Sequence, residues 1–196
     1  MEEKYPIDVK TISNAAVVRF NRPEIKNPLS IRTLQILSSE LEAIESNSLI
    51  EVIVFTGSEN TFAAGANLSE VAQLNEKTAL EFGLRGQRLM ERIHRSKKFT
   101  VAAIDGFCLG GGLDLAISCN SRVATPGSFF AHPGAKLGII TGWGGTQFLP
   151  RLIGRKRALE MFLTAERVDA ATALEIGLID ELSTDPLAKA LEKARQ

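Results

Sequence analysis

Short hydrophobic runs alternate along the chain with longer stretches in which hydrophobic residues recur at helical spacing. The runs at 15–20, 51–57 and 100–105 are nearly continuous and end at polar or glycine residues, which is typical of buried strands. Residues 31–44 and 78–96 carry the helical pattern. Strands that alternate with helices predict an α/β fold with mostly parallel pairing and right-handed connections.

Shorter segments complete the predicted order. Three further strands are expected, at 8–12, 122–125 and 129–130. After Gly144 the pattern is helical, with helices predicted at 157–164, 170–176 and 187–195. Ser30, Asp169 and Asp185 each precede a predicted helix and are expected to cap it. Residues 1–196 are expected to form a single domain, with a core at about 5–165 and short C-terminal helices at about 166–196.

Composition and charge narrow the class of protein. The 196 residues are 44% hydrophobic and 23% charged, as in an ordinary soluble globular protein. The net formal charge is zero, so we expect no nucleic-acid partner and no anionic membrane surface. Residues 1–6 contain no hydrophobic signal region. Cys108 and Cys119 lie in hydrophobic surroundings and are predicted to be buried thiols, which favours a reducing, cytoplasmic location.

Arginines recur at helical spacing within the predicted helix at 78–96. They are Arg85, Arg88, Arg92 and Arg95. Glu81 and Glu91 each stand four residues before an arginine, which predicts ion pairs on a solvated face rather than a phosphate site.

The segment Gly106–Asp114 is the strongest candidate for chemistry. Three consecutive glycines, 110–112, lie between the predicted strand and an apolar helix start. N–H groups at a helix N-terminus lack intrahelical partners, and the helix dipole there favours negative charge. A carbonyl oxygen that becomes an oxyanion would be stabilised there, with Asp114 beside it to handle a proton. A tight turn followed by an ordinary first-turn aspartate explains the same residues.

A second glycine-bearing turn, Phe62–Leu68, follows the strand at 51–57. Its small alanines would allow a ligand close to the backbone, and Asn67 can cap a short helix. By itself this segment is explained equally by a simple turn. Because the carboxyl ends of parallel strands line one crevice, N–H groups from the two segments are expected to converge on one oxygen.

Together these segments resemble the crotonase (enoyl-CoA hydratase/isomerase) superfamily. The similarity runs through 62–68 and 103–116 and continues through 137–147, 149–154 and 173–179, so it covers nearly the whole chain. The resemblance implies a spiral of ββα turns with mostly parallel sheets, assembled as trimers or pairs of trimers. It also implies a shared chemistry, in which the enolate of an acyl-CoA thioester is stabilised.

Carried over by position, the resemblance assigns the oxyanion hole to the backbone N–H groups of Ala66 and Gly111, and acid/base chemistry to Asp114. Contact with substrate and CoA is assigned to two facing loops and the glycine turn: Lys26, Asn27, Leu29, Ala64, Gly65, Ala66, Asn67, Leu68, Gly110 and Gly111. No metal or redox cofactor is implied, since CoA enters as part of the substrate and the sequence has no His/Cys cluster or dinucleotide fingerprint.

The chain departs from the hydratases of this superfamily at both of their glutamates. The first falls on Asp114, and the second falls on Gly134, which has no side chain. A single carboxylate is enough to move a proton along an allylic system, so isomerase-like transfer is favoured over hydration. His132 is an alternative second group on the same side of an extended segment, unless it is a structural or surface histidine. Trp143 is expected to pack in the core or to line an acyl pocket.

The chain also stops after the helix predicted at 187–195, where members of this superfamily continue with helices that cap the pocket. A truncated C-terminal helical region is therefore expected, with either a reduced core or a partner that covers the pocket. A non-catalytic acyl-CoA-binding or assembly subunit is the alternative to an enzyme.

Overall fold

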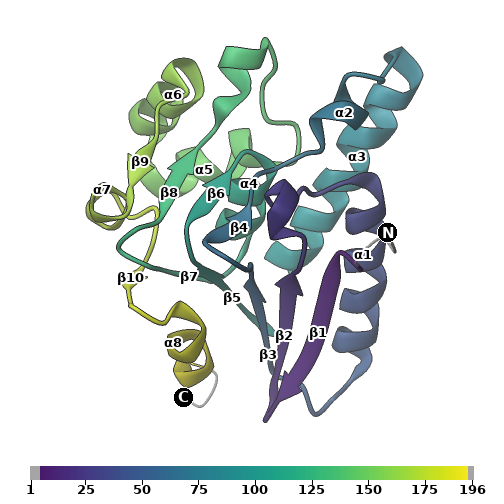
Figure 1. The fold of residues 1–196 in the computed structure, drawn as a ribbon, viewed down its shortest axis with the longest axis vertical. Helices are drawn as coiled ribbons and strands as arrows, with labels where there is room; N and C mark the ends of the chain where they lie inside the picture. Colours follow the sequence, from purple (N-terminus) through teal and green to yellow (C-terminus); the bar gives the residue numbers. More distant parts are fainter. Residues whose placement is uncertain (1–4, 194–196) are drawn as a thin grey trace.

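The computed structural model describes residues 5–193 and contains two sheets with helices around them (Figure 1). The first sheet has six strands in the order β1-β2-β3-β5-β7-β10. Their bounds are β1 (Ile7–Ile12), β2 (Ala15–Phe20), β3 (Val52–Thr56), β5 (Phe99–Ile104), β7 (Ser121–Ala124) and β10 (Glu181–Leu182). β1 and β2 form an antiparallel pair, and the other neighbours in this sheet are parallel. The predicted α/β class and parallel pairing are confirmed.

The second sheet contains four short strands in the order β4-β6-β8-β9. Their bounds are β4 (Thr61–Ala63), β6 (Phe107–Leu109), β8 (Phe129–Ala131) and β9 (Val168–Asp169). Along the chain, β3-β4, β5-β6 and β7-β8 each contribute one strand to each sheet before a helix follows. This is the expected spiral of ββα turns. The sequence pattern identified β8 but not β4 or β6, because a three-residue strand next to glycine leaves too short a hydrophobic run.

The helices pack around these sheets, and three of them begin at the predicted caps Ser30, Asp169 and Asp185. Their bounds are α1 (Ile31–Ser46), α2 (Leu68–Val71), α3 (Glu76–His94), α4 (Gly111–Ser118), α5 (Gly145–Ile153), α6 (Arg155–Thr164), α7 (Ala170–Glu175) and α8 (Pro186–Lys193), with 3₁₀ turns η1 (Pro23–Ile25) and η2 (Pro133–Leu137). Ser30 caps α1, Asp169 caps α7, and Asp185 accepts a hydrogen bond from Ala188 N–H. The predicted end of the last helix, Arg195, lies outside the described residues.

Both faces of the first sheet are covered, which explains why its strands are hydrophobic without alternation. On one face, Ile53, Phe55 and Ile104 belong to the main core with α1, α3 and α4. Side chains that point the other way, including Val54 and Val101, pack against α8. The C-terminal part of the chain contains strands as well as helices, since β9 and β10 each join a sheet.

Helix α4 lies in the interior, and residues 112–118 are all buried. Its position carries Asp114 into the centre of the molecule. Cys108 and Cys119 are free, buried thiols, as predicted. Within residues 5–193, the helices are either too short or too polar to cross a membrane.

Candidate active site

The two glycine-bearing segments of the sequence meet at the start of α4. A Cβ built on Gly65 would lie 2.9 Å from the N atom of Gly111, and one built on Gly111 would lie 3.6 Å from the N atom of Ala66. The segments follow β4 and β6, which are parallel neighbours in the second sheet. The hydrophobic pattern predicts that they follow β3 and β5, which is wrong, because the short second sheet holds the two loops side by side.

The N–H groups of Ala66 and Gly111 have no hydrogen-bond acceptor among the described residues. Gly111 is the first residue of α4, so its N–H is one of those that a helix leaves unpaired. The backbone around it requires glycine: Gly110 has φ of 52° and Gly65 has φ of 92°. A backbone bond from Gly110 N–H to the carbonyl of Ala131 fixes the turn at 2.9 Å.

Asp114 projects from the first turn of α4 and is 1% exposed. Its Oδ2 accepts a hydrogen bond from the Thr141 hydroxyl. Its Oδ1 has no hydrogen-bond partner and lies 3.6 Å from His132 Nε2. Burial raises the pKa of Asp114 to about 7, and the Thr141 hydrogen bond opposes this rise. The carboxyl group therefore titrates where a general acid or base works best.

His132 is buried rather than a surface residue. It is 3% exposed and immediately precedes η2, and its ring lies 5.1 Å from that of Phe162 on α6. Burial lowers the pKa of His132 to about 4, so its imidazole is neutral at neutral pH.

Trp143 is also buried and fills the space between α3 and α4. A Cβ on Gly111 would lie 2.4 Å from Cζ3 of its ring, and a Cβ on Gly86 would lie 2.1 Å from Cδ1. Phe82 packs on the same ring at 5.2 Å. The indole therefore covers Gly111, beside the free N–H groups.

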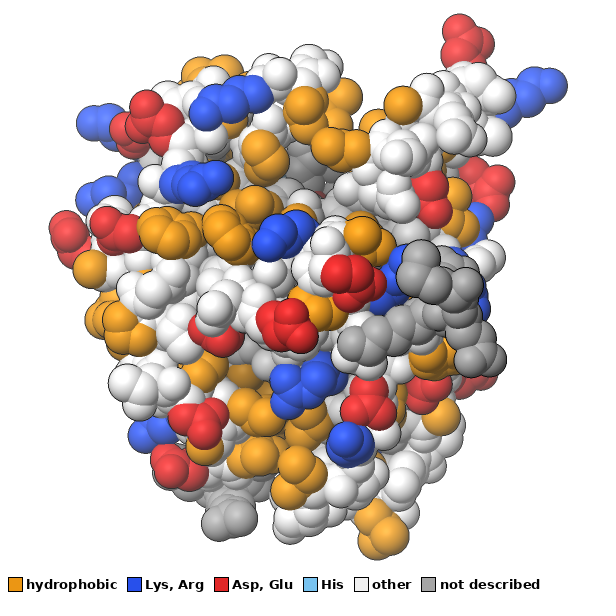
Figure 2. Space-filling model, viewed as in Figure 1, with side chains coloured by type: hydrophobic (Ala, Val, Ile, Leu, Met, Phe, Trp, Pro, Cys, Tyr) orange, Lys and Arg blue, Asp and Glu red, His pale blue; other side chains and the backbone are white. Residues whose placement is uncertain are grey.

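A cavity of about 300 Å³ opens where these groups meet. Glycine and alanine backbone from both loops forms one wall, with Asp114 and His132 at its polar side. The remaining lining is largely hydrophobic: Leu68, Val71, Ala79, Phe82, Leu137, Ile139, Ile140 and Trp143. Figure 2 shows hydrophobic side chains gathered beside a hollow at the base of the projecting α2–α3 tip. The cavity therefore offers a mainly apolar compartment with a small polar end.

Gly134 also lines this cavity and brings no side chain to it. Its φ is not in the left-handed region, but a Cβ there would lie 2.5 Å from the carbonyl oxygen of Ile139. The Ile139 N–H also donates to the Gly134 carbonyl at 3.0 Å. A close backbone contact, rather than an unusual conformation, thus restricts this position.

The loop at residues 26–29 lies against the loop at 64–68. Ala64 N–H donates to the Lys26 carbonyl at 3.0 Å, and Leu29 N–H donates to the Gly65 carbonyl at 2.8 Å. The side chain of Asn27 is buried and bonds to backbone at Arg22 and Thr61, and Leu29 is fully buried. These two side chains therefore hold the loop in place. Lys26 is exposed, with Nζ 5.7 Å from the centre of the Phe107 ring.

Residues 67 and 68 begin a helix beside the cavity. The side chain of Asn67 caps α2 by accepting from Ser69 and Glu70 N–H groups. Leu68 is 54% exposed at the cavity rim. Asn67 is thus engaged with the backbone, whereas Leu68 is free to contact a ligand.

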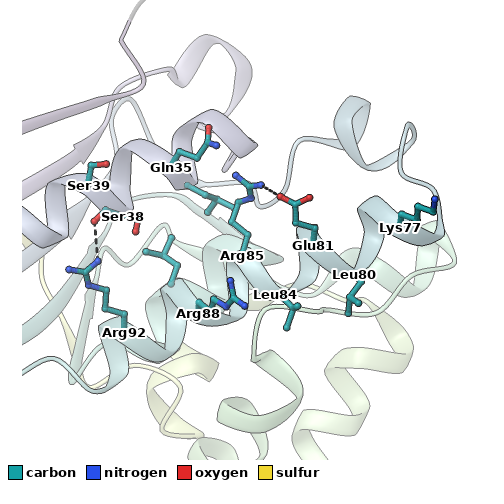
Figure 3. A pocket seen from close by; sticks show the side chains of 12 residues that line it. Gln35, Ser38, Ser39, Lys77, Leu80, Glu81, Leu84, Arg85, Arg88 and Arg92 are labelled. Atoms are coloured by element: carbon teal, nitrogen blue, oxygen red, sulfur yellow. Dashed lines mark hydrogen bonds and ion pairs between the residues drawn. The ribbon is translucent and has the colours of Figure 1, made fainter.

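A larger hollow, about 750 Å³, lies between α1 and α3 (Figure 3). Two of its three arginines are engaged: Arg85 pairs with Glu81 at 2.7 Å, and Arg92 bonds to Glu45 and to the carbonyl of Ser38. Arg95 pairs with Glu91, so the predicted i,i+4 ion pairs are confirmed. The one acid in its lining, Glu81, has a side chain that is 71% exposed, and we do not place catalysis there.

Thr141 is the residue of the site that sequence reasoning missed. It stands in the loop between η2 and α5 and holds one oxygen of Asp114. In the sequence, nothing distinguishes Thr141 from an ordinary exposed threonine. The one indication of a role in the site is its position two residues before Trp143. Across residues 5–193, no three His, Cys, Asp or Glu side chains come close enough to hold a metal ion.

Comparison with known proteins gives one family. The model of the enoyl-CoA hydratase/isomerase family matches residues 10–196. The short-chain-enoyl-CoA hydratase of Clostridium acetobutylicum is 38% identical over 168 residues, covering 85% of this chain and 64% of that relative. A putative enoyl-CoA hydratase/isomerase of Bacillus subtilis is 42% identical over 182 residues, covering 91% of this chain and 70% of that relative. This chain therefore spans about two thirds of the length of these relatives.

Solved structures share this fold over nearly the whole chain. DspI of Pseudomonas aeruginosa superposes with a TM-score of 0.92 at 32% identity, covering 100% of this chain and 83% of that one. An enoyl-CoA hydratase from Bacillus anthracis superposes with a TM-score of 0.92 at 33% identity, covering 97% of this chain and 76% of that one.

Proposed function

The chain belongs to the enoyl-CoA hydratase/isomerase family, and on that premise we propose that it acts on an acyl-CoA thioester. In this proposal, Ala66 and Gly111 N–H groups bind the thioester oxygen, and Asp114 is the single acid/base group. The favoured reaction is the shift of a double bond along the acyl chain, from a 3-enoyl to a 2-enoyl thioester.

The proposed reaction is balanced in protons and electrons. Ionised Asp114 removes a proton from C2, the C2–H electron pair passes into the thioester, and negative charge collects on its oxygen. The two N–H groups stabilise that charge, and single donors of this kind contribute about 3–4 kcal/mol in other enzymes. Asp114 then returns the proton to C4 as the electrons move back, so the double bond has moved and the enzyme is unchanged.

One observation carries the proposal: a buried carboxyl group shares a cavity with two unpaired N–H groups that lie close together. Burial brings the pKa of Asp114 to about 7, so at neutral pH a large fraction can take a proton and the acid formed can return it. The apolar lining favours an aliphatic acyl group over a polar one.

The preference for isomerisation over hydration rests on Gly134. Hydration needs a second group that activates water, and glycine cannot provide one. The relatives named hydratases support the family chemistry but do not decide between the two reactions in this chain. The reaction needs no metal or redox cofactor, because CoA enters as part of the substrate.

The remaining parts of the proposal concern CoA and assembly. The loop at 64–68 and exposed Lys26 lie on one side of the cavity and are proposed to contact CoA. The protein is proposed to act as a homo-oligomer, trimer or hexamer, in the cytoplasm. Light scattering on the purified protein tests the oligomeric state.

The function is tested by giving purified protein a 3-enoyl-CoA and, separately, crotonyl-CoA, and by following the absorbance of the conjugated thioester. Conjugation should appear with the first substrate and should depend on Asp114, whereas little should be lost with the second. Binding of both thioesters without turnover would instead support a non-catalytic acyl-CoA-binding subunit. Rapid loss of conjugation with crotonyl-CoA would identify a hydratase and contradict the isomerase assignment.

A further inference from the structure

Two buried polar atoms face each other at the polar end of the cavity. Asp114 Oδ1 and His132 Nε2 are 3.6 Å apart, and neither has a hydrogen-bond partner among the described residues. Their side chains are 1% and 3% exposed, so bulk water does not satisfy them. Unpaired buried polar atoms cost free energy, and two such atoms side by side point to a shared function.

The distance favours a direct proton contact over a bridging water. A water that donates or accepts at a normal length of about 2.8 Å to each of two groups, at its usual angle, holds them more than about 4 Å apart. A separation of 3.6 Å is too short for that arrangement and only slightly longer than a direct N···O hydrogen bond. A small side-chain rotation closes the gap.

The other oxygen of Asp114 is already occupied. Thr141 donates its hydroxyl hydrogen to Oδ2, so Oδ1 is the oxygen that remains free to gain a proton. Once protonated, Oδ1 becomes a donor, and neutral imidazole offers its unprotonated nitrogen as an acceptor.

We propose that His132 is a positioning residue for Asp114, whose Nε2 accepts the hydrogen bond of the carboxyl group when Oδ1 carries the proton. The inference rests on the proposed function for its catalytic consequence, but not for the pairing itself. In the reaction, this bond would hold the neutral acid in place between removal of the proton from C2 and its return to C4. The two side chains thus bind one proton between them.

The surroundings of the pair contain few other groups that titrate. From β6, the buried Cys108 thiol couples electrostatically to Asp114. From α5, Gly145 lies against Oδ1, and from α6 the ring of Phe162 lies against His132. The directions of the two pKa shifts agree with the pairing, since Asp114 holds its proton more tightly and His132 stays neutral.

The pairing can be measured without substrate, because the sequence contains only two histidines. Imidazole ¹⁵N spectra of the whole protein are recorded from pH 5 to 9, and His94→Gln assigns the signals. His94 is exposed on α3 and provides the matched control. We expect the Nε2 signal of His132 to be that of an unprotonated nitrogen and to move in one step near pH 7, as Asp114 loses its proton. That step should be absent in Asp114→Asn and unchanged in His94→Gln.

A wild-type signal from His132 that shows no step between pH 6 and 8, or a protonated Nε2 throughout, would overturn the inference. The wild-type titration decides this even if a variant fails to fold. With turnover as a second readout, His132→Gln should lower kcat more than it changes KM and move the acid limb of kcat to lower pH. Absence of turnover in the wild type, with the ¹⁵N step present, would contradict the proposed function and leave the pairing intact.

Discussion

Gly86 on α3 faces the indole of Trp143 so closely that a Cβ on Gly86 would lie 2.1 Å from the ring atom Cδ1. The other side of the same ring system covers Gly111, where a Cβ would come within 2.4 Å of Cζ3. Two glycines on separate helices therefore set the position of a single tryptophan. Through that ring, the packing of α3 is connected to the N-terminus of α4.

Gly86→Ala is predicted to destabilise the protein by about 1–3 kcal/mol, because the added methyl group must displace a buried ring. Gly83→Ala on the same helix is the matched control, since a Cβ at Gly83 would meet no atom within 4 Å. At Gly83 alanine should be neutral or stabilise by up to about 1 kcal/mol through helix propensity. Urea unfolding measures both. Equal effects at the two positions would contradict the packing argument.

Asp114→Asn is predicted to lower kcat about 10²–10⁴-fold while thioester binding stays close to that of the wild type, because the amide keeps the shape and loses the proton acceptor. Turnover and binding of the substrate are measured separately. Asp8→Asn, at an exposed ion pair with Lys10 on β1, is the control. A kcat within about threefold of wild type would remove Asp114 from the acid/base role.

The buried carboxyl group should also make stability depend on pH. Because the pKa of Asp114 is raised from 3.8 to about 7, the native state binds more protons than the unfolded state between these values. The contribution of Asp114 to the free energy of unfolding of the wild type is therefore fully present below pH 4 and is lost as the pH rises towards 7. Asp114→Asn has no such loss. The free energy of unfolding of the variant, relative to that of the wild type, should therefore increase by about 3 kcal/mol between pH 5 and pH 8.

The contribution of His132 has the opposite sign, since its pKa falls from 6.5 to about 4 and stability rises with pH across that interval. Both proteins in the comparison keep His132, so the part of its contribution that does not depend on Asp114 cancels in the difference. Urea unfolding at the two pH values gives the measurement. A difference between variant and wild type that is independent of pH would show that the carboxyl group titrates normally.

Gly111→Pro is predicted to remove the N–H group while remaining compatible with the first position of a helix. The new ring also meets Trp143, so Gly111→Ala serves as the control that has a similar clash and keeps the N–H. Proline should lower kcat about 10²–10³-fold beyond alanine, the size expected for one oxyanion donor. If the folded variants have equal rates, Gly111 N–H does not bind the reacting oxygen.

From the sequence alone, Gly134→Glu is expected to create hydratase activity, since it places a glutamate where the hydratases of this superfamily carry one. The structure changes this expectation, because a Cβ at Gly134 would lie 2.5 Å from the Ile139 carbonyl oxygen. We predict no gain of crotonyl-CoA hydration and a lower midpoint of thermal unfolding, and Gly134→Ala should show the same destabilisation. Strong hydration by a normally stable Gly134→Glu protein would show that the loop yields easily.

The hydrophobic pattern by itself predicted five of the six strands of the first sheet, all except β10, and the long helices α1 and α3. β2 runs from Ala15 to Phe20 and α1 begins after its Ser30 cap, as predicted. These elements are long or well capped, so local preferences and burial agree on them. The resemblance to a known family likewise identified the fold, and with it the neighbourhood of Ala66, Gly111 and Asp114.

The tertiary structure alone decided the arrangement of the site. The strands that hold the two loops together, β4 and β6, have three residues each, and their pairing is a long-range contact with no periodic signal. The approach of His132 to Asp114, and the hold of Thr141 on the other carboxylate oxygen, join residues 18 and 27 positions away along the chain. Burial, which moves both pKa values, depends on everything packed around α4. The sequence specified the chemical groups, and only packing set the distances and the environment in which they act.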